Sequence, residues 1–422
     1  MRRSTRHKRR RKLFWIPLTA LLAAASLVVI YLLVQPIWPG SSGPEETSND
    51  AADSASIDPA ASATPPPPTP EPTPPEPVFE DAVWIGVGDV MSHSPQLPGA
   101  YDAELDTYDF TPFFEEVKPI LAQGDWVMAN METPVAGKDF GYSGYPTFNA
   151  PVELAEALKG AGFNLLSTAN NHSLDKGEKG LLRTLEHLKE LGFTTVGTAA
   201  SQEEADTPVI SEQNGIRMGL LSYTYGTNGI PIPEGKPYLV SLIDEEKMKS
   251  DIRKLRDAGA DVVTIALHFG NEYQTTPTEE QKRLARALVA AGADIIAGSH
   301  PHVIQPYEVI ETEDLNGQTK KALIIYSMGN FISNQRGDSK DYGVIFKVGV
   351  RKNVTEGTTT LTDVEAIPTW VHRYQPDRYY RYRVLPVEET IAAMDDELLG
   401  TNIYKQLQTD YDMLIQRLES LQ

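Results

Sequence analysis

The sequence contains no cysteine in its 422 residues. Disulfide bonds and thiolate-bound metals are therefore excluded, because both require a cysteine sulfur. Any metal ion must instead be held by histidine, aspartate, glutamate or asparagine side chains. The absence of cysteine is compatible with an extracellular location but does not establish one.

Basic residues are scarce outside the first twelve positions. The segment "MRRSTRHKRRRK" contains eight Lys or Arg and no acid, whereas the rest of the chain carries 30 basic and 58 acidic residues, a net charge of −28. So acidic a surface argues against nucleic acid as a partner. It would also repel a polyanion unless a metal ion or a local cluster of basic residues offsets the charge.

Long hydrophobic runs are absent except at residues 13–34, "LFWIPLTALLAAASLVVIYLLV", which are 22 residues without a charge. A helix of this length crosses the roughly 30 Å of hydrocarbon in a bilayer. Basic residues precede it and an acidic region follows, which predicts a cytoplasmic N-terminus. A cleaved signal peptide ending near "AAAS" (23–26) is the alternative, but the apolar run continues past that point. We expect an uncleaved single-pass anchor in the cell membrane.

The composition along the chain predicts five regions. A basic cytoplasmic tail (1–12) and the transmembrane anchor (13–35) come first. Residues 36–78 form an extracellular linker, in which "TPPPPTPEPTPPEP" (64–77) is typical of a stiff polyproline II spacer. A folded extracellular domain is expected at 79–370, followed by a largely helical C-terminal extension at 371–422.

Strand and helix patterns alternate within the expected domain. Apolar β-rich runs predict strands at 82–89, 125–132, 163–172, 217–225, 260–270 and 293–302, with further strands between 303 and 350. Amphipathic patterns predict helices at 111–123, 150–162, 177–192, 245–259 and 278–292. This alternation is typical of an α/β fold.

Polar residues fall repeatedly where these strands end. They are Asp89, Glu132, the pair Asn171 and His172, His268, and the pair His300 and His302 in "GSHPH". Ligands in α/β sheets bind beyond the carboxyl ends of strands. Taken singly, each residue could be a turn former, a helix cap or a packing residue. Five of the eight histidines fall in or beside this set when His93 is included, which favours one shared site.

The donor types predict a divalent metal site for Mn, Zn or Fe. The candidate ligands are Asp89, His93, Glu132, Asn171, His268, His300 and His302. Pro301 biases His300 toward an extended backbone, in which His300 and His302 point the same way. A bound ion would lower the pKa of a water to about 7, and His172 would act as general acid or anion clamp.

Several residues allow two interpretations. Asp175 is a candidate catalytic partner of Asn171 and His172, or else it caps the following helix. Glu272 could act in catalysis by orienting a ligand imidazole. Asn330 could line the site or cap a turn. The segment "HRYQPDRYYRYR" (372–383) could hold carboxylates through its arginines or form an amphipathic edge strand.

Seven motifs together resemble those of the CapA family of capsule synthesis proteins. They are "GDVMSHSP" (88–95), "ANMETPV" (129–135), "ANNHSLDKGEKGL" (169–181), "SYTYGTNG" (222–229), "LHFGNEY" (267–273), "GSHPHVIQP" (298–306) and "YSMGNFISNQ" (326–335). The resemblance implies a calcineurin-like metallophosphoesterase-type sandwich of two β-sheets flanked by helices. It also implies a bacterial surface protein that assembles, exports or anchors poly-γ-glutamate, an anionic polymer.

The wider phosphoesterase pattern is matched only in part. It has Asp-x-His where this chain has Met91, and a bridging Asp where this chain offers Glu132. A metal-dependent hydrolase-like site in a capsule protein is the leading interpretation. The alternatives are a metal-dependent phosphatase or phosphodiesterase acting on another envelope substrate, and a non-enzymatic scaffold for membrane synthetase subunits.

Overall fold

The computed structural model describes residues 76–313, 317 and 319–422. The expected tail, the expected anchor and most of the expected linker lie outside the described residues. Within those residues, no helix combines the length and the apolar character needed to cross a bilayer.

Two β-sheets form the centre of the described domain. The first has eight strands, in the order β16 (Arg381–Pro386), β15 (Thr358–Tyr374), β14 (Tyr342–Asn353), β1 (Phe79–Val90), β4 (Trp126–Met131), β5 (Leu165–Ser167) and β6 (Thr194–Val196), with β13 (Asn330–Ile332) beside β1. The second has six, in the order β11 (Tyr307–Glu313), β12 (Thr319–Ile325), β10 (Ile295–Ser299), β9 (Val262–His268), β8 (Ile216–Thr224) and β7 (Val209–Gln213). A separate hairpin pairs β2 (Tyr101–Asp102) with β3 (Thr107–Tyr108).

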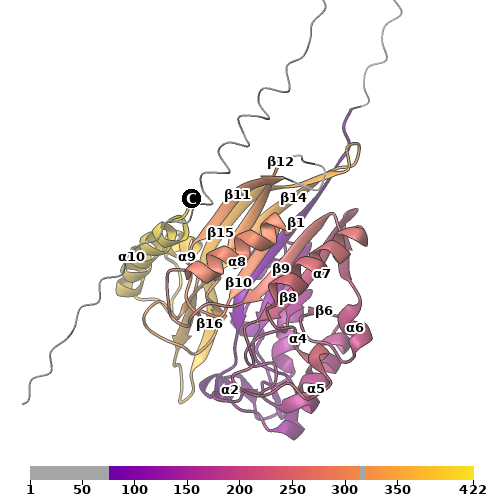
Figure 1. Ribbon diagram of the computed structural model, residues 1–422. Coiled ribbons are helices and arrows are strands. Elements are labelled where there is room, and N and C mark those ends of the chain that lie inside the picture. The colour runs from indigo at the N-terminus through magenta and orange to yellow at the C-terminus, as the bar shows by residue number, and fades with distance from the viewer. Residues whose placement is uncertain (1–75, 314–316, 318) are drawn as a thin grey trace, which may run out of the picture. The chain divides into compact units, whose positions relative to one another are not determined.

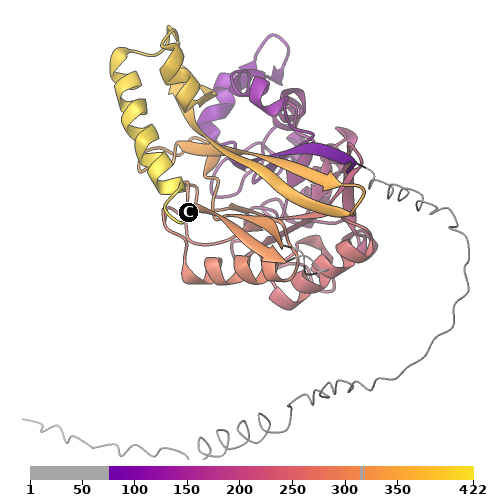
Figure 2. The same cartoon turned by 90° about the horizontal axis from the view of Figure 1, so that it is seen from above.

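Helices cover the outer faces of both sheets (Figures 1 and 2). On the first sheet lie α3 (Lys118–Leu121), α4 (Glu153–Ala161) and α5 (Gly177–Glu190), and on the second lie α7 (Glu245–Asp257) and α8 (Glu279–Ala290). The C-terminal helices α9 (Val387–Ala393) and α10 (Thr401–Leu418) pack against β15. The short pieces are α2 (Leu97–Ala100), α6 (Gln202–Asp206), and the 3₁₀ turns η2 (Ser94–Gln96), η3 (Thr111–Phe113), η4 (Lys138–Phe140) and η5 (Pro237–Leu239). The expected α/β sandwich of two sheets flanked by helices is therefore present.

The apolar runs exist because the central strands are buried on both faces. In β1, Trp84 points into the core between the sheets, where it lies in register with Trp126 of β4. Ile85 and Val87 alternate to the opposite face and pack under the outer helices. A strand covered on both faces reads as a continuous apolar run, which is the pattern that predicted β1.

Parallel strands bring their carboxyl ends to one edge of the sandwich. In the first sheet β1, β4, β5 and β6 run parallel, and in the second β8, β9, β10 and β12 do so. The polar residues that follow these strands therefore converge. Their convergence positions the candidate site.

Local details differ from the sequence-based expectations. The helix expected at 111–123 is split into η3 and α3, because Pro119 has no N–H to donate and its ring clashes with the carbonyl four residues earlier. The strand expected at 163–172 stops at Ser167, beyond which residues 168–176 form a polar loop. The boundary expected at residue 370 falls inside β15, and β16 then pairs with that strand as an edge.

Candidate metal centre

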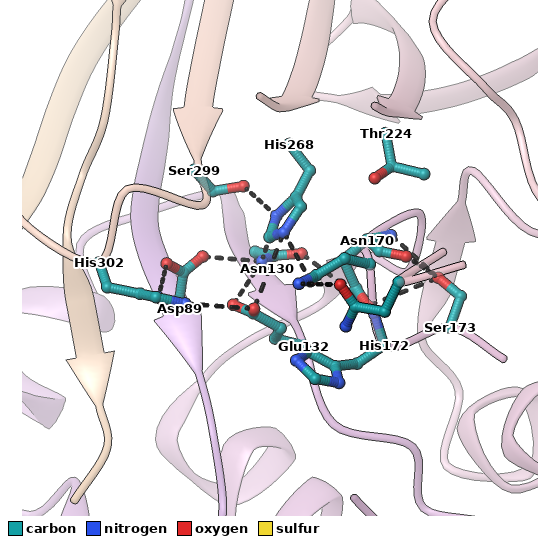
Figure 3. A network of polar contacts seen from close by, with 12 residues as sticks. Asp89, Asn130, Glu132, Asn170, His172, Ser173, Thr224, His268, Ser299 and His302 are labelled. Carbon is teal, nitrogen blue, oxygen red and sulfur yellow. Dashed lines mark hydrogen bonds and ion pairs between the residues drawn. The ribbon is translucent and has the colours of Figure 1, made fainter. Parts of the chain in front are cut away.

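The candidate centre lies where the two sheets face each other at their carboxyl ends (Figure 3). The first sheet contributes Asp89 of β1 and Asn130 of β4, which are in register on neighbouring strands. The second contributes His268 of β9 and Ser299 of β10, which are also in register. Each sheet thus presents an adjacent polar pair to the other.

A hydrogen-bond network joins these residues across the two sheets. Asp89 accepts from Asn130 Nδ2 through Oδ1 at 2.8 Å and lies 2.9 Å from His302 Nδ1 through Oδ2. His268 Nε2 is 2.9 Å from Asn171 Oδ1, and His268 Nδ1 is 3.0 Å from Ser299 Oγ. The His302 ring is consequently fixed in orientation by Asp89 on the first sheet, and the His268 ring by Asn171 in a loop.

Glu132, immediately after β4, presents an oxygen that has no hydrogen-bond partner among the described residues. Its Oε1 is buried and lies 3.7 Å from His268 Nε2 and 3.6 Å from His302 Nε2. Glu132 and Asp89 are fully buried, and neither pairs with a Lys or Arg in the described ranges. Buried carboxylates without a cationic partner are costly, so this donor set fits a divalent cation.

Two groups of side chains have the spacing of metal ligands. Asp89, Glu132 and His268 offer ligand atoms within 4.8 Å of one another, and Glu272, His300 and His302 form a second such group. In the second group His300 Nδ1 is buried and has no hydrogen-bond partner in the described part of the chain, whereas Glu272 is exposed. Carboxylate and imidazole donors in these numbers fit Mn, Zn or Fe. A bound ion would supply a Lewis acid and an acidified water.

The electrostatics of the centre reflect its burial. Burial and then the neighbouring Asp89 carboxylate raise the pKa of Glu132 well above its ordinary value. Burial, followed by the His300 and His302 imidazoles, lowers the pKa of His268 well below its ordinary value. Burial and then His302 lower the pKa of His300 to about 4. These histidines are therefore neutral at physiological pH, the form in which imidazole binds metal.

The backbone of "SHPH" is not extended, and the expectation for His300 was wrong. His300 has φ +98° and His302 has φ +56°, both in the region that non-glycine residues seldom adopt. The loop is held by Tyr273 N donating to Pro301 O at 2.8 Å and by the contact of His302 with Asp89. The two rings still lie 6.0 Å apart and face the same region. Such strain persists where surrounding contacts fix it, and it is typical of functional sites.

His172 lies in the loop after β5 with a carboxylate behind it. Its Nδ1 is 2.7 Å from Asp175 Oδ2, which also accepts from Phe148 N at 2.6 Å. The Phe148 ring packs edge-on against the imidazole, with centroids 4.7 Å apart. Because the Nδ1 proton is given to Asp175, Nε2 is the nitrogen available to exchange a proton with a bound substrate. Asp175 thus orients an imidazole rather than capping a helix.

Two sequence candidates lie beside the centre rather than in either ligand group. His93 Nδ1 accepts from Asn334 N at 3.3 Å, and its ring packs edge-on against Phe148. Asn330 Nδ2 donates to His302 O at 3.2 Å, so this residue supports the histidine loop. Among the other histidines, His372 is stacked between Trp370 and Tyr374, the packing role that its place in a strand indicates.

Asn130 and Ser299 are members of the network beyond the candidates expected from the sequence. Asn130 Nδ2 contacts Asp89 and lies 3.3 Å from His268 Nδ1, so it connects the two sheets. It precedes Glu132 by two residues in "ANMET", and residues two apart on a strand share a face. That spacing could have identified Asn130, whereas nothing local marks Ser299.

Comparison with known proteins finds similar sequences and similar solved structures. Among solved structures, the calcineurin-like phosphoesterase YfkN from Bacillus subtilis is similar over 80% of this chain and 100% of that chain, with 14% identity and a TM-score of 0.40. A likeness of this size defines neither a substrate nor a reaction.

The sequence relatives are closer. The capsule biosynthesis protein CapA of Bacillus anthracis is 32% identical over 335 residues, which cover 74% of this chain and 75% of that protein. The PGA biosynthesis protein CapA of Bacillus subtilis (strain 168) is 30% identical over 269 residues, covering 60% and 64%. The model of the bacterial capsule synthesis protein family PGA_cap matches residues 84–335, more than half of the chain. The seven motifs thus indicated the right relatives, and the chain belongs to the PGA_cap family of bacterial capsule synthesis proteins.

Proposed function

We propose that this protein assembles, exports or anchors a poly-γ-glutamate capsule, and that its folded domain acts on the polymer through a divalent metal held at the strand ends. The observation that carries the proposal is the buried Glu132 Oε1, which has no partner in the described domain and faces two imidazoles. Membership of the capsule synthesis family supports the polymer as substrate. Residues 13–35 would anchor the domain at the outer surface of the cell membrane.

The residues around the centre have separable roles in this proposal. Asp89, Glu132, Asn171, His268, His300 and His302 would hold the ion. Asn130 and Ser299 fix the rings and carboxylates that surround it. In cleavage of a γ-amide bond, water would add its oxygen to the γ-carbonyl carbon as the C–N bond breaks. His172, oriented by Asp175, would accept the proton of that water at Nε2 and give it to the departing amine. Glu272 would lie at the exposed side of the centre, where substrate enters.

Metal content tests the first part of the proposal. The purified wild-type protein should retain metal after purification without chelator, whereas Glu132→Gln and the double variant His300→Ala/His302→Ala should retain less than about a tenth as much. His372→Ala is the matched control, because that buried histidine is stacked between aromatic rings away from the ligand groups. Elemental analysis measures the metal, and circular dichroism establishes that each variant is folded.

Absence of metal from the wild type after incubation with Mn or Zn would contradict the metal centre. The role in the capsule is tested separately, by restoring surface polymer in a poly-γ-glutamate producer that lacks its own family member. If folded His172→Ala/His300→Ala/His302→Ala protein restores the polymer fully, the scaffold alternative replaces the enzymatic one. Metal-stimulated turnover of phosphoesters without any effect on the polymer would favour the phosphodiesterase alternative.

A further inference from the structure

The loop between β13 and β14, residues 333–341, is tied to the candidate metal centre at two points. Asn334 N donates to His93 Nδ1 at 3.3 Å, and His93 in turn packs against Phe148 beside His172. Asn330, at the start of β13, donates to His302 O at 3.2 Å and to Lys340 O at 2.8 Å. Cationic side chains on this loop are therefore held at a fixed place beside the centre.

Two guanidinium groups meet at this loop. Arg373 of β15 donates through Nη1 to Asn334 Oδ1 at 3.2 Å, and the Tyr382 hydroxyl donates to the same oxygen at 2.6 Å. Arg336 lies over the Tyr382 ring with its Cζ 5.7 Å from the centroid, and Arg373 lies 4.5 Å from that of Tyr380. Aromatic faces hold an arginine in place while leaving its edge free to bind an anion.

Neither arginine has its charge fully paired. Arg336 donates through Nη1 to Val371 O at 2.8 Å, with Asp341 at 3.9 Å, but its buried Nε and Nη2 have no partner in the described ranges. Arg373 has no carboxylate within ion-pair distance among the residues described. Burial lowers the pKa of Arg336 to about 10, with a further lowering by the neighbouring Arg373 and an opposing rise from Asp341. The guanidinium therefore stays charged at neutral pH. Unpaired guanidinium donors in a partly buried position favour an anionic ligand.

A third cation lies on the other side of the same loop. Lys340 Nζ is 5.0 Å from the centroid of the Tyr273 ring, and that ring is 6.1 Å from the ring of His302. Its carboxylate neighbour, Asp338, is exposed and 3.5 Å away, a distance at which an exposed pair contributes little. The loop thus presents basic groups next to both His93 and His302.

We propose that Arg336, Lys340 and Arg373, here called the basic rim, bind successive carboxylates of a glutamate polymer whose reacting unit lies at the metal centre. The proposal rests on the function proposed above and adds the residues that would recognise the substrate. The chain beyond residue 12 carries a net charge of −28, so a polyanion needs such a local cluster to approach. The planar guanidinium fork matches a carboxylate in two-point contact, which favours a carboxylate polymer.

Polymer affinity tests the basic rim. Fluorescently labelled poly-γ-glutamate is titrated with the full-length purified protein, and fluorescence anisotropy gives the Kd. Arg336→Gln/Arg373→Gln should raise the Kd by at least about tenfold, because two charge-assisted contacts are lost. Arg378→Gln removes the same charge from an exposed residue of the same segment and should change the Kd by less than about twofold. Arg373→Lys, which keeps the charge but loses the fork, should fall between the two.

Further arms separate this proposal from the function on which it rests. Glu132→Gln should lose metal yet keep polymer binding that depends on the rim, so a failed metal centre and a failed rim give different results. If the double variant does not fold, Arg373→Gln alone should still raise the Kd by about threefold. Unchanged affinity in a folded double variant overturns the proposal, as does a metal-loaded wild type that binds no polymer. Tighter binding of polyphosphate than of poly-γ-glutamate would assign the rim to phosphate polymers instead.

Discussion

Replacement of His172 by alanine should lower polymer turnover by about 10²–10⁴-fold, the usual contribution of a positioned general acid. The side chain lies in neither ligand group, so metal content should stay at the wild-type level. Its Nδ1 is held by Asp175, and Phe148 packs against its ring, which leaves Nε2 to accept a proton and pass it to the leaving amine. Turnover is measured as the release of new amino termini from poly-γ-glutamate by the metal-loaded protein.

A second substitution distinguishes proton transfer from packing. Asp175→Asn keeps the size of the side chain but removes the charge that fixes the tautomer of His172, so it should also slow turnover at full metal content. His187→Ala is the histidine control. That residue lies on helix α5, and its Nδ1 is 2.6 Å from Val135 O, so its ring serves packing. Wild-type turnover in metal-loaded His172→Ala would remove the proton donor from the mechanism.

Gly298→Ala should destabilise the domain by about 3 kcal/mol, because a side chain there overfills a packed strand pair. A Cβ at this position would lie 2.2 Å from Tyr326 O and 2.4 Å from Ile325 O, both backbone atoms at the end of β12. Neither oxygen can rotate away, so β10 and β12 must separate. The displacement reaches Ser299 and His300 directly after it, and metal content should fall together with stability.

Urea denaturation of the purified protein, followed by circular dichroism, measures this effect. Gly160→Ala is the matched control, because no heavy atom lies within 4 Å of the added Cβ in helix α4. That substitution should be neutral or stabilise the protein by up to about 1 kcal/mol, since alanine is the better helix former. Equal stabilities for the two variants would show that the close approach of β10 and β12 is not needed.

Much of the fold follows from local patterns in the sequence. Apolar runs such as "AVWIGV" (82–87) predicted strands, and the amphipathic pattern at 177–192 predicted α5, in which Leu181, Leu185 and Leu188 are buried. Residues 111–123 are split although their spacing is amphipathic, because the missing N–H of Pro119 outweighs that spacing. These features depend on steric and burial preferences over a few residues.

The composition and the positions of polar residues also determined which chemistry is available. The lack of cysteine restricted any metal to oxygen and imidazole donors, and the strand-end positions of Asp89, Glu132 and His268 predicted that they would meet. The tertiary structure alone decided that Ser299 joins them, that His93 lies beside them, and that His300 adopts a positive φ. Those outcomes depend on the order of strands within each sheet and on the distance between the sheets. Strand pairings between distant segments set both, from Ile295 with Leu323 to Phe79 with Asn353, and no local pattern encodes them.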